Sequence, residues 1–208
     1  MTEVLKITPE TSEQIINEAA AAILRGEIIA YPTETFYGLG ADANNEEAIR
    51  KIFDLKGRDF KNPISVIIGS RVDVYPLITG STDVAEKLMA FFWPGALTIV
   101  FNAAPTVSPL LTAQTGKIGI RLSSHETARR IAQKAGRPLT ATSANISGMT
   151  ECAVAEDVMK QIGNEINIFV DAGATAGGDV STIIDVTCTP PAILREGAVC
   201  TEFVKKIL

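Results

Sequence analysis

The stretch EIIAYPTETFYGLG (residues 27–40) joins a short apolar run to a turn rich in hydroxyl groups. Its first half predicts a buried strand, and Pro32 disfavours helix at Tyr31. The threonines and the glutamate that follow offer hydroxyls and a carboxylate, and the two later glycines permit close approach of a ligand to the backbone. An ordinary strand-to-helix turn, whose hydroxyls satisfy local amides, explains the same residues. The segment alone leaves both interpretations open.

Outward from this stretch, segments with helical spacing of apolar residues alternate with short apolar strands. Helices are predicted over residues 12–26, 45–58, 81–93, 123–136 and 153–163. Further strands are predicted over residues 63–70, 96–103, 117–122, 166–173, 181–187 and 192–197. Strands and helices interleave early in the chain, and strands cluster late. We therefore expect a single α/β (α+β) domain over residues 1–208, with a mixed and twisted sheet.

The composition indicates a globular protein without a membrane contact. Of the 208 residues, 46% are hydrophobic, yet no apolar run approaches the ~20 residues that cross a bilayer. The polar N-terminus lacks the features of a signal peptide, so we expect a cytoplasmic location. The net charge of −5 argues against sequence-independent binding of nucleic acid, which depends on Lys and Arg, although a local basic patch stays open.

Candidate metal ligands and nucleotide fingerprints are sparse. His125 is the only histidine, and Cys152, Cys188 and Cys200 are far apart in the sequence, with no CxxC pair. A zinc site of several histidines is therefore excluded, and we predict no metal site built from side chains. Because the patterns GxxxxGK[ST] and GxGxxG are both absent, a nucleotide would have to be held in another way.

Several polar turns are candidates for a binding site, because loops on a rigid scaffold commonly carry function. LKGRDFKNP (residues 55–63) gathers three cations, which either favour the helix dipole or grip phosphates. LTATSANISG (139–148) offers short polar side chains for its own turn, for an anion or for a base edge. GIRLSS (119–124) and GGDVSTIIDV (177–186) add a lone arginine and two hydroxyls. The residues alone predict a pocket for an anion and leave the reaction open.

In their order and spacing, these segments resemble the YrdC family, and the resemblance covers nearly the whole chain. The matching pieces are YPTETFYGLG, KGRDFKNP, FWPGALT, GIRL, TATSANISG, STIIDV and REG. The resemblance implies a twisted mixed sheet flanked by helices around a concave pocket. The most similar members are L-threonylcarbamoyladenylate synthases, which are nucleotidyltransferases that make threonylcarbamoyl-AMP and pyrophosphate from ATP, bicarbonate and L-threonine. Their product feeds the threonylcarbamoyl modification of adenosine 37 in tRNA.

The resemblance also implies two sets of ligand-binding residues. For ATP the set is Lys56, Arg58, Thr142, Ser143, Asn145 and Arg195. For L-threonine it is Thr33, Arg121 and Ser181. Lys56 and Arg58 would be the catalytic residues because they would stabilise charge on the phosphates, and Mg²⁺ would accompany ATP. Arg121 suits the carboxylate of the amino acid.

Two motifs within the resemblance bear on the branch of the family. The Lys-x-Arg pair at Lys56 and Arg58 and the Ser-x-Asn pair at Ser143 and Asn145 separate the synthases from the similar YciO branch. Where the family commonly has proline after the arginine, this chain has Asp59, which we expect to place a carboxylate beside the phosphate site. The alternative is an RNA-binding or YciO-like protein without adenylation activity. The resemblance implies the downstream tRNA threonylcarbamoyl-transferase machinery as a partner, and it leaves a weak contact with tRNA open.

Overall fold

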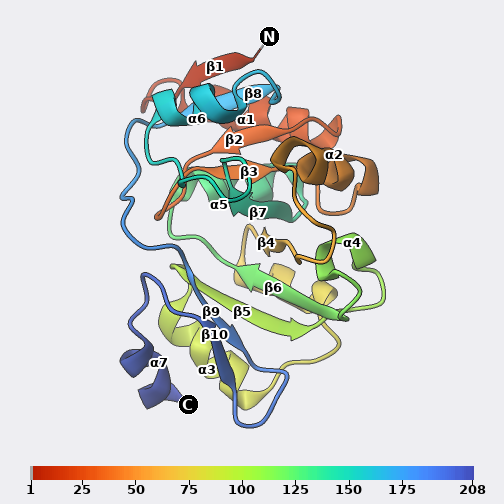
Figure 1. The fold of residues 1–208 in the computed structure, drawn as a ribbon. Coiled ribbons are helices and arrows are strands. Elements are labelled where there is room, and N and C mark those ends of the chain that lie inside the picture. Colours follow the sequence, from red (N-terminus) through yellow and green to blue (C-terminus); the bar gives the residue numbers. More distant parts are fainter. Residues whose placement is uncertain (1) are drawn as a thin grey trace.

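A mixed sheet of ten strands forms the centre of the computed structural model, which describes residues 2–208 (Figure 1). The strands are β1 (Glu3–Lys6), β2 (Ile29–Tyr31), β3 (Gly38–Gly40), β4 (Ser65–Ile67), β5 (Leu97–Asn102), β6 (Lys117–Arg121), β7 (Leu139–Ser143), β8 (Ile168–Asp171), β9 (Thr182–Asp185) and β10 (Ala192–Arg195). Their order in the sheet is β1-β8-β2-β3-β7-β4-β6-β5-β9-β10. Parallel pairs such as β5 with β9 lie beside antiparallel pairs such as β5 with β6. The expectation of a mixed α/β sheet is confirmed.

The helices form where the sequence supplies an apolar stripe. They are α1 (Ser12–Leu24), α2 (Glu46–Lys56), α3 (Asp83–Phe92), α4 (Pro109–Thr112), α5 (Glu126–Ala135), α6 (Ala155–Ile162) and α7 (Thr201–Ile207), with a 3₁₀ helix at Arg71–Leu77. Helices α2, α3 and α4 also begin at a residue whose side chain caps them. The side chain of Asn45 caps α2 by accepting hydrogen bonds from the amides of Glu47 and Ala48. Among residues 2–208, no helix has the length and apolar character needed to cross a membrane.

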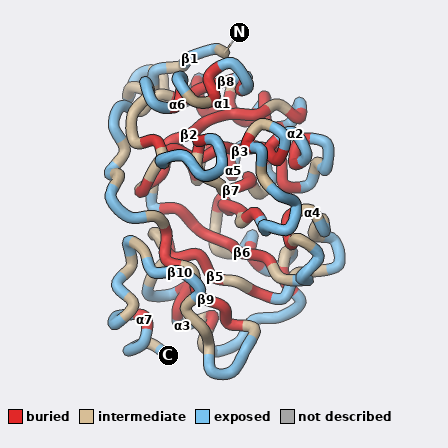
Figure 2. The backbone as a smooth tube through the Cα atoms, in the orientation of Figure 1, coloured by how far each residue is buried: buried red, intermediate tan, exposed pale blue. Residues whose placement is uncertain are grey.

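Alternating side chains of β2 point into two separate apolar clusters of the interior. Ile29 and Tyr31 of β2 pack in the cluster that contains the apolar residues of α1 and α5. Ala30, between them, belongs to the larger cluster, which includes α2 and α3. Figure 2 shows the buried strands running between more exposed helices and loops. Side chains on both faces therefore fix the register of these strands.

Strand β3 was not predicted from the sequence, because two of its three residues are glycines and show no apolar alternation. A Cβ atom at Gly38 would lie 2.9 Å from Cζ of Tyr31, and one at Gly40 would lie 2.6 Å from Cε1. The buried ring of Tyr31 therefore lies across β3, and its hydroxyl donates a hydrogen bond to the main-chain oxygen of Thr140 at 3.0 Å. The missing side chains of these glycines therefore leave room for the tyrosine ring, and Gly38 also lines the cavity described below.

Strand β7 changes partners along its length and so positions a polar segment. Its first residues, Leu139 to Ala141, pair with β4, whereas Thr142 and Ser143 pair with β3. The chain then leaves the sheet as the loop of residues 144–149, beside the C-terminal end of α2. The two motifs around residues 56 and 143 are thereby brought together.

Candidate functional site

A cavity of about 520 Å³ lies where the turn after β2 meets the C-terminal end of α2 and the ends of β6, β7 and β10. All nine residues predicted to bind a ligand line it: Thr33, Lys56, Arg58, Arg121, Thr142, Ser143, Asn145, Ser181 and Arg195. They come from segments spread over most of the chain. The fold thus gathers the two predicted ligand sets around one space, while the role of each residue stays a prediction.

Lys56 is the last residue of α2 and is only 2% exposed. Its Nζ donates hydrogen bonds to the main-chain oxygens of Ser143 and Asn145, at 2.6 and 2.5 Å, and to Oδ1 of Asn145 at 3.1 Å. Burial, and then the charge of Arg58, lower the pKa of Lys56 to about 8. Three acceptors match the three N–H groups of an ammonium and so favour its charged form. Lys56 therefore clamps the loop after β7 and supplies positive charge from behind it.

The loop after β7 uses one of the predicted side chains internally. The Ser143 hydroxyl donates to Oδ1 of Asn145 at 2.6 Å, and Nδ2 of Asn145 donates to the main-chain oxygen of Met149 at 2.6 Å. The Asn145 amide is therefore committed to the loop, and the residue is 4% exposed. The hydroxyl of Thr142 makes no hydrogen bond within residues 2–208, and the Ser143 oxygen keeps acceptor capacity. This geometry favours Thr142 and Ser143 for direct contact with a ligand.

Arg58 reaches the cavity because α2 ends at a glycine. Gly57 adopts the left-handed conformation, with φ of 58°, and the chain reverses there. The Arg58 guanidinium donates from Nε and Nη2 to the main-chain oxygens of Asn62 and Pro63, at 3.3 and 2.9 Å. A guanidinium has five N–H groups, so donors remain for a ligand. Burial lowers the pKa of Arg58.

The expectation that Asp59 would place a carboxylate beside the phosphate site was wrong. Asp59 is exposed and is not among the residues that line the cavity. Its Oδ1 accepts a hydrogen bond from the amide of Lys61 at 2.9 Å, so the side chain fixes the turn after α2.

Arg121 is the last residue of β6 and is 7% exposed. Its Nε lies 3.8 Å from Oε1 of Glu34, and both atoms are buried without a hydrogen-bond partner. Within the described part of the chain, the guanidinium makes this ion pair and no hydrogen bond. A buried arginine with unused donors on a cavity wall is suited to a carboxylate ligand. Glu34 was not predicted as its partner, because 87 positions of the sequence, from 34 to 121, separate the two residues and no spacing pattern relates them.

Ser181 links the two predicted ligand sets directly. Its hydroxyl lies 3.0 Å from Oγ1 of Thr98 and accepts a hydrogen bond from Nη2 of Arg195 at 2.9 Å. Nε of Arg195 also donates to the main-chain oxygen of Ser181 at 3.0 Å. Arg195, predicted for the ATP side, thus contacts a residue predicted for the threonine side. Thr98 was missed because it lies in the apolar run of β5, and the lining of the cavity reveals it.

The turn after β2 combines the two interpretations that its sequence left open, because some of its hydroxyls bond within the turn and others face the cavity. The Thr33 hydroxyl donates to the main-chain oxygen of Phe36 at 2.6 Å, lies 3.0 Å from Oγ1 of Thr35 and accepts from the Thr35 amide at 3.1 Å. These contacts use its donor and both acceptor sites inside the turn. Thr35 also lines the cavity and keeps acceptor capacity there. Thr33 therefore shapes the turn, and Thr35 is the better placed of the two hydroxyls.

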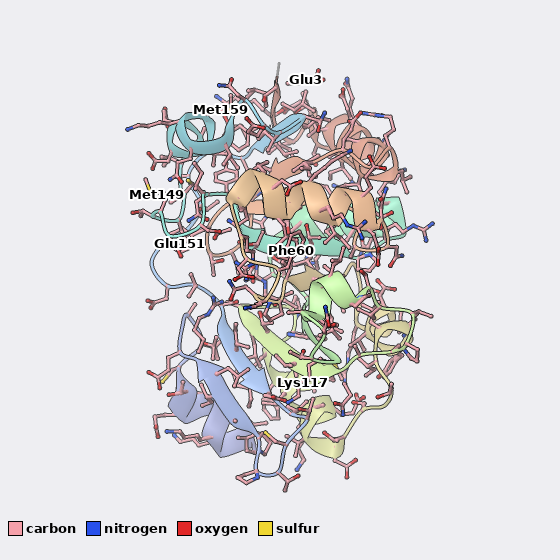
Figure 3. The ribbon with its side chains drawn as sticks, turned by 45° about the vertical axis from the view of Figure 1, so that its right-hand side comes forward. Glu3, Phe60, Lys117, Met149, Glu151 and Met159 are labelled. Atoms are coloured by element: carbon pink, nitrogen blue, oxygen red, sulfur yellow. The ribbon has the colours of Figure 1, made fainter. Side chains whose placement is uncertain are left out.

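Most of the charged side chains that line the cavity are cationic. It carries Lys56, Arg58, Arg121 and Arg195, and its one carboxylate is Glu151, on the segment between β7 and α6 (Figure 3). In a chain of net charge −5, this local concentration of positive charge favours an anionic ligand. Residues 2–208 contain no group of three or more His, Cys, Asp or Glu side chains that could hold a metal ion.

Comparison with known proteins identifies the family. The Sua5/YciO/YrdC family model, described as "Telomere recombination", matches residues 21–197. The chain belongs to this family. The resemblance found from the sequence motifs is confirmed, and the cavity described above lies within the Sua5/YciO/YrdC match.

Two curated relatives of this Sua5/YciO/YrdC chain are named threonylcarbamoyl-AMP synthase. The Pyrococcus abyssi (strain GE5 / Orsay) protein is 36% identical over 208 residues, which are 100% of this chain and 61% of the relative. The Bacillus subtilis (strain 168) protein is 36% identical over 199 residues, or 95% of this chain and 58% of the relative. The chain therefore spans about three fifths of the length of these two relatives. A Vibrio parahaemolyticus protein of the same name, 35% identical, is covered over 98% of its length.

Solved structures confirm the fold expected for the Sua5/YciO/YrdC family. A crystal structure of P. abyssi Sua5 complexed with L-threonine has a TM-score of 0.95 and 36% identity, covering 100% of this chain and 61% of that one. E. coli YciO has a TM-score of 0.88 at 22% identity, covering 97% of this chain and 98% of that one. At that identity, the YciO likeness shows the fold alone.

Proposed function

We propose that this chain is an L-threonylcarbamoyladenylate synthase, which makes threonylcarbamoyl-AMP and pyrophosphate from ATP, bicarbonate and L-threonine. The observation that carries the proposal is the single cavity that combines the cationic pair Lys56 and Arg58 with Arg121, an arginine that has unused donors. The names of the relatives and the L-threonine complex of P. abyssi Sua5 support the same conclusion.

The amino acid is proposed to lie at the end of the cavity formed by Arg121, Ser181 and the turn after β2. Its carboxylate would accept hydrogen bonds from Arg121. Thr35, Ser181 and Thr98 supply hydroxyls that could recognise its amine or hydroxyl. A site that hydrogen-bonds the substrate hydroxyl rejects an apolar analogue more strongly than an apolar pocket rejects one methylene.

The nucleotide is proposed to lie against the end of α2 and the loop after β7. Arg58 would contact phosphate oxygens with its remaining N–H groups, and Thr142 and Ser143 would bond phosphate or nucleoside groups. Lys56 would act through its charge and through the loop that it holds. Arg195 contacts Ser181, so it would stand where the two substrates meet.

The reaction needs no side-chain nucleophile. The threonine amine attacks the carbon of bicarbonate, or of CO₂ derived from it, and water is released from bicarbonate as the carbamate forms. A carbamate oxygen then attacks the α-phosphorus of ATP, the bond from that phosphorus to the bridging oxygen breaks, and pyrophosphate leaves. Positioning of the two substrates and stabilisation of negative charge by Arg58, Lys56 and Arg195 are the contributions required of the protein.

Mg²⁺ is proposed to arrive with the triphosphate as part of the substrate. The cavity offers only one carboxylate, Glu151, and Mg²⁺ in such sites is commonly held by phosphate oxygens and water. The cytoplasmic location and the downstream tRNA threonylcarbamoyl-transferase partner are proposals of the same kind.

Release of pyrophosphate by the purified chain tests the proposal. With ATP and Mg²⁺, release is expected only when L-threonine and bicarbonate are both present, and omission of either should abolish it. Release that needs neither, or no release under any of these conditions, would reject the synthase and favour the YciO-like or RNA-binding alternative.

A further inference from the structure

We propose that Glu34 is a positioning residue: anchored by Ser123, its carboxylate holds the guanidinium of Arg121 in the orientation that receives the carboxylate of the amino-acid substrate. The inference rests on the proposed function, because that function supplies the substrate carboxylate. Glu34 does not line the cavity and has no role in the chemistry described above.

The contact between Glu34 and Arg121 is buried, and the Glu34 carboxylate faces the Nε side of the guanidinium. The two side chains are 15% and 9% exposed, and Oε1 of Glu34 lies 3.8 Å from Nε of Arg121. Neither atom has a hydrogen-bond partner among the described residues. A buried charge is strongly unfavourable unless it is paired, so each of these groups depends on the other. Because Nε is the atom nearest to Glu34, the terminal Nη groups stay available for a ligand.

Glu34 is itself anchored from the other side. Its Oε2 accepts a hydrogen bond from the hydroxyl of Ser123, a residue that is 0% exposed. The Ser123 hydroxyl also accepts from the amide of His125 at 3.1 Å, and Nη1 of Arg129 donates to the Ser123 main-chain oxygen at 2.6 Å. Ser123 thus belongs to a fixed turn between β6 and α5, only two residues after Arg121.

This arrangement explains why an acidic residue lies behind an anion-binding arginine. A guanidinium has five N–H groups, enough to face one carboxylate of the protein and one of the ligand. Without the charge of Glu34, the Arg121 side chain would lose its only ionic partner in the described part of the chain and could adopt other orientations. The expected consequence is a specific loss of affinity for the carboxylate of the substrate.

Binding of L-threonine and of L-threoninol, which lacks the carboxylate, tests the inference by isothermal titration calorimetry on the full chain. Wild type should prefer L-threonine. Glu34→Gln keeps the size of the side chain and should lower that preference about tenfold, which is the effect expected for a weakened charge-assisted contact. The affinity of the same variant for L-threoninol should change less than about twofold. Arg121→Ala should remove the preference. Glu27→Gln is the matched control, because Glu27 pairs with Arg25 outside the cavity and should keep the wild-type preference.

Equal losses for both ligands in Glu34→Gln would show a merely structural role and would overturn the inference, as would an unchanged preference. If Glu34→Gln does not fold, Ser123→Ala takes its place. That variant removes the anchor of Glu34 and should lower the preference in the same direction by a smaller factor, and an unchanged preference would again overturn the proposal. Wild type that prefers L-threonine but releases no pyrophosphate would reject the synthase and leave the Glu34 inference standing. Wild type without the preference would overturn the carboxylate site and the inference together.

Discussion

The Nζ atom of Lys56 lies 2.6 Å from the main-chain oxygen of Ser143, although 87 positions separate the two residues in the sequence. The contact joins the end of α2 to the end of β7. Together with the two hydrogen bonds from Lys56 to Asn145, it makes the Lys-x-Arg and Ser-x-Asn motifs one structural unit. A substitution in one motif should therefore alter the structure of the other.

Lys56→Met should disorganise the loop after β7, because methionine cannot donate to the three acceptors that Lys56 serves. We expect the free energy of unfolding in urea to fall by about 1–3 kcal/mol, and product formation to fall at least ~10-fold. Lys51→Met is the control, since Lys51 lies on the same helix with its side chain 50% exposed, and stability there should change by less than about 0.5 kcal/mol. Equal stability and turnover in both variants would contradict the role of Lys56 as a clamp.

The pKa of Lys56, about 8 in place of the ordinary 10.5, makes both stability and nucleotide affinity depend on pH. Above pH 8 the folded protein loses this charge, so ATP affinity should fall as the pH rises from about 7 to about 9.5. Between about pH 8 and pH 10.5, the folded and the ordinary pKa of this lysine, the unfolded chain binds more protons than the folded one, so the contribution of this group to stability rises with pH across that interval. Calorimetric titration and urea unfolding measure the two trends. ATP affinity with the same pH dependence in Lys56→Met would rule out Lys56 as its source.

Arg58→Ala should impair the reaction without unfolding the protein, because the guanidinium holds only two main-chain oxygens of its own turn. Loss of a charge-assisted contact to phosphate predicts a fall in kcat/KM for ATP of at least ~10-fold. Lys61→Ala in the same turn provides the comparison, since Lys61 is exposed and does not line the cavity. If the two variants turned over equally, Arg58 would have no special part in the reaction.

Gly40→Ala should destabilise the protein because a Cβ atom there would lie 2.6 Å from the ring of Tyr31. Displacing a buried ring from a packed core costs about 1–3 kcal/mol. Gly80→Ala is the matched control, because a Cβ atom at that exposed glycine would meet nothing within 4 Å. Urea unfolding of the two variants should separate them, and equal midpoints would contradict the packing argument.

The sequence predicted the elements whose apolar residues show a clear period. Helices such as α1, α2 and α5 were found in this way, and so were the strands β5 and β6. Strand β1 was not found, because its residues are mostly exposed and it forms only by pairing with β8, far along the chain. Strand β3 was not predicted, because its glycines break the apolar alternation that indicates a strand. Helix α4 is a single turn between the strands predicted over residues 96–103 and 117–122, in a segment for which no element was predicted.

The sequence motifs predicted which residues would line the site. The contacts that each of these residues makes depend on hydrogen bonds and ion pairs with residues far away in the sequence, which the motifs do not reveal. Asn145 is bonded within its loop, and Arg195 contacts Ser181, neither of which follows from residue type. Glu34 looked like one polar residue among several in a turn. Its relation to Arg121 depends on pairings of the strands that only the folded chain brings about.

Mass spectrometry of the product formed from ATP, Mg²⁺, L-threonine and ¹³C-labelled bicarbonate tests whether this chain joins the amino acid to the nucleotide. If one cavity joins the amino acid to the nucleotide, the product will be threonylcarbamoyl-AMP that carries the label and depends on L-threonine. Formation of AMP and pyrophosphate alone, or of an unlabelled adenylate of threonine, would show that the chain is not a threonylcarbamoyl-AMP synthase.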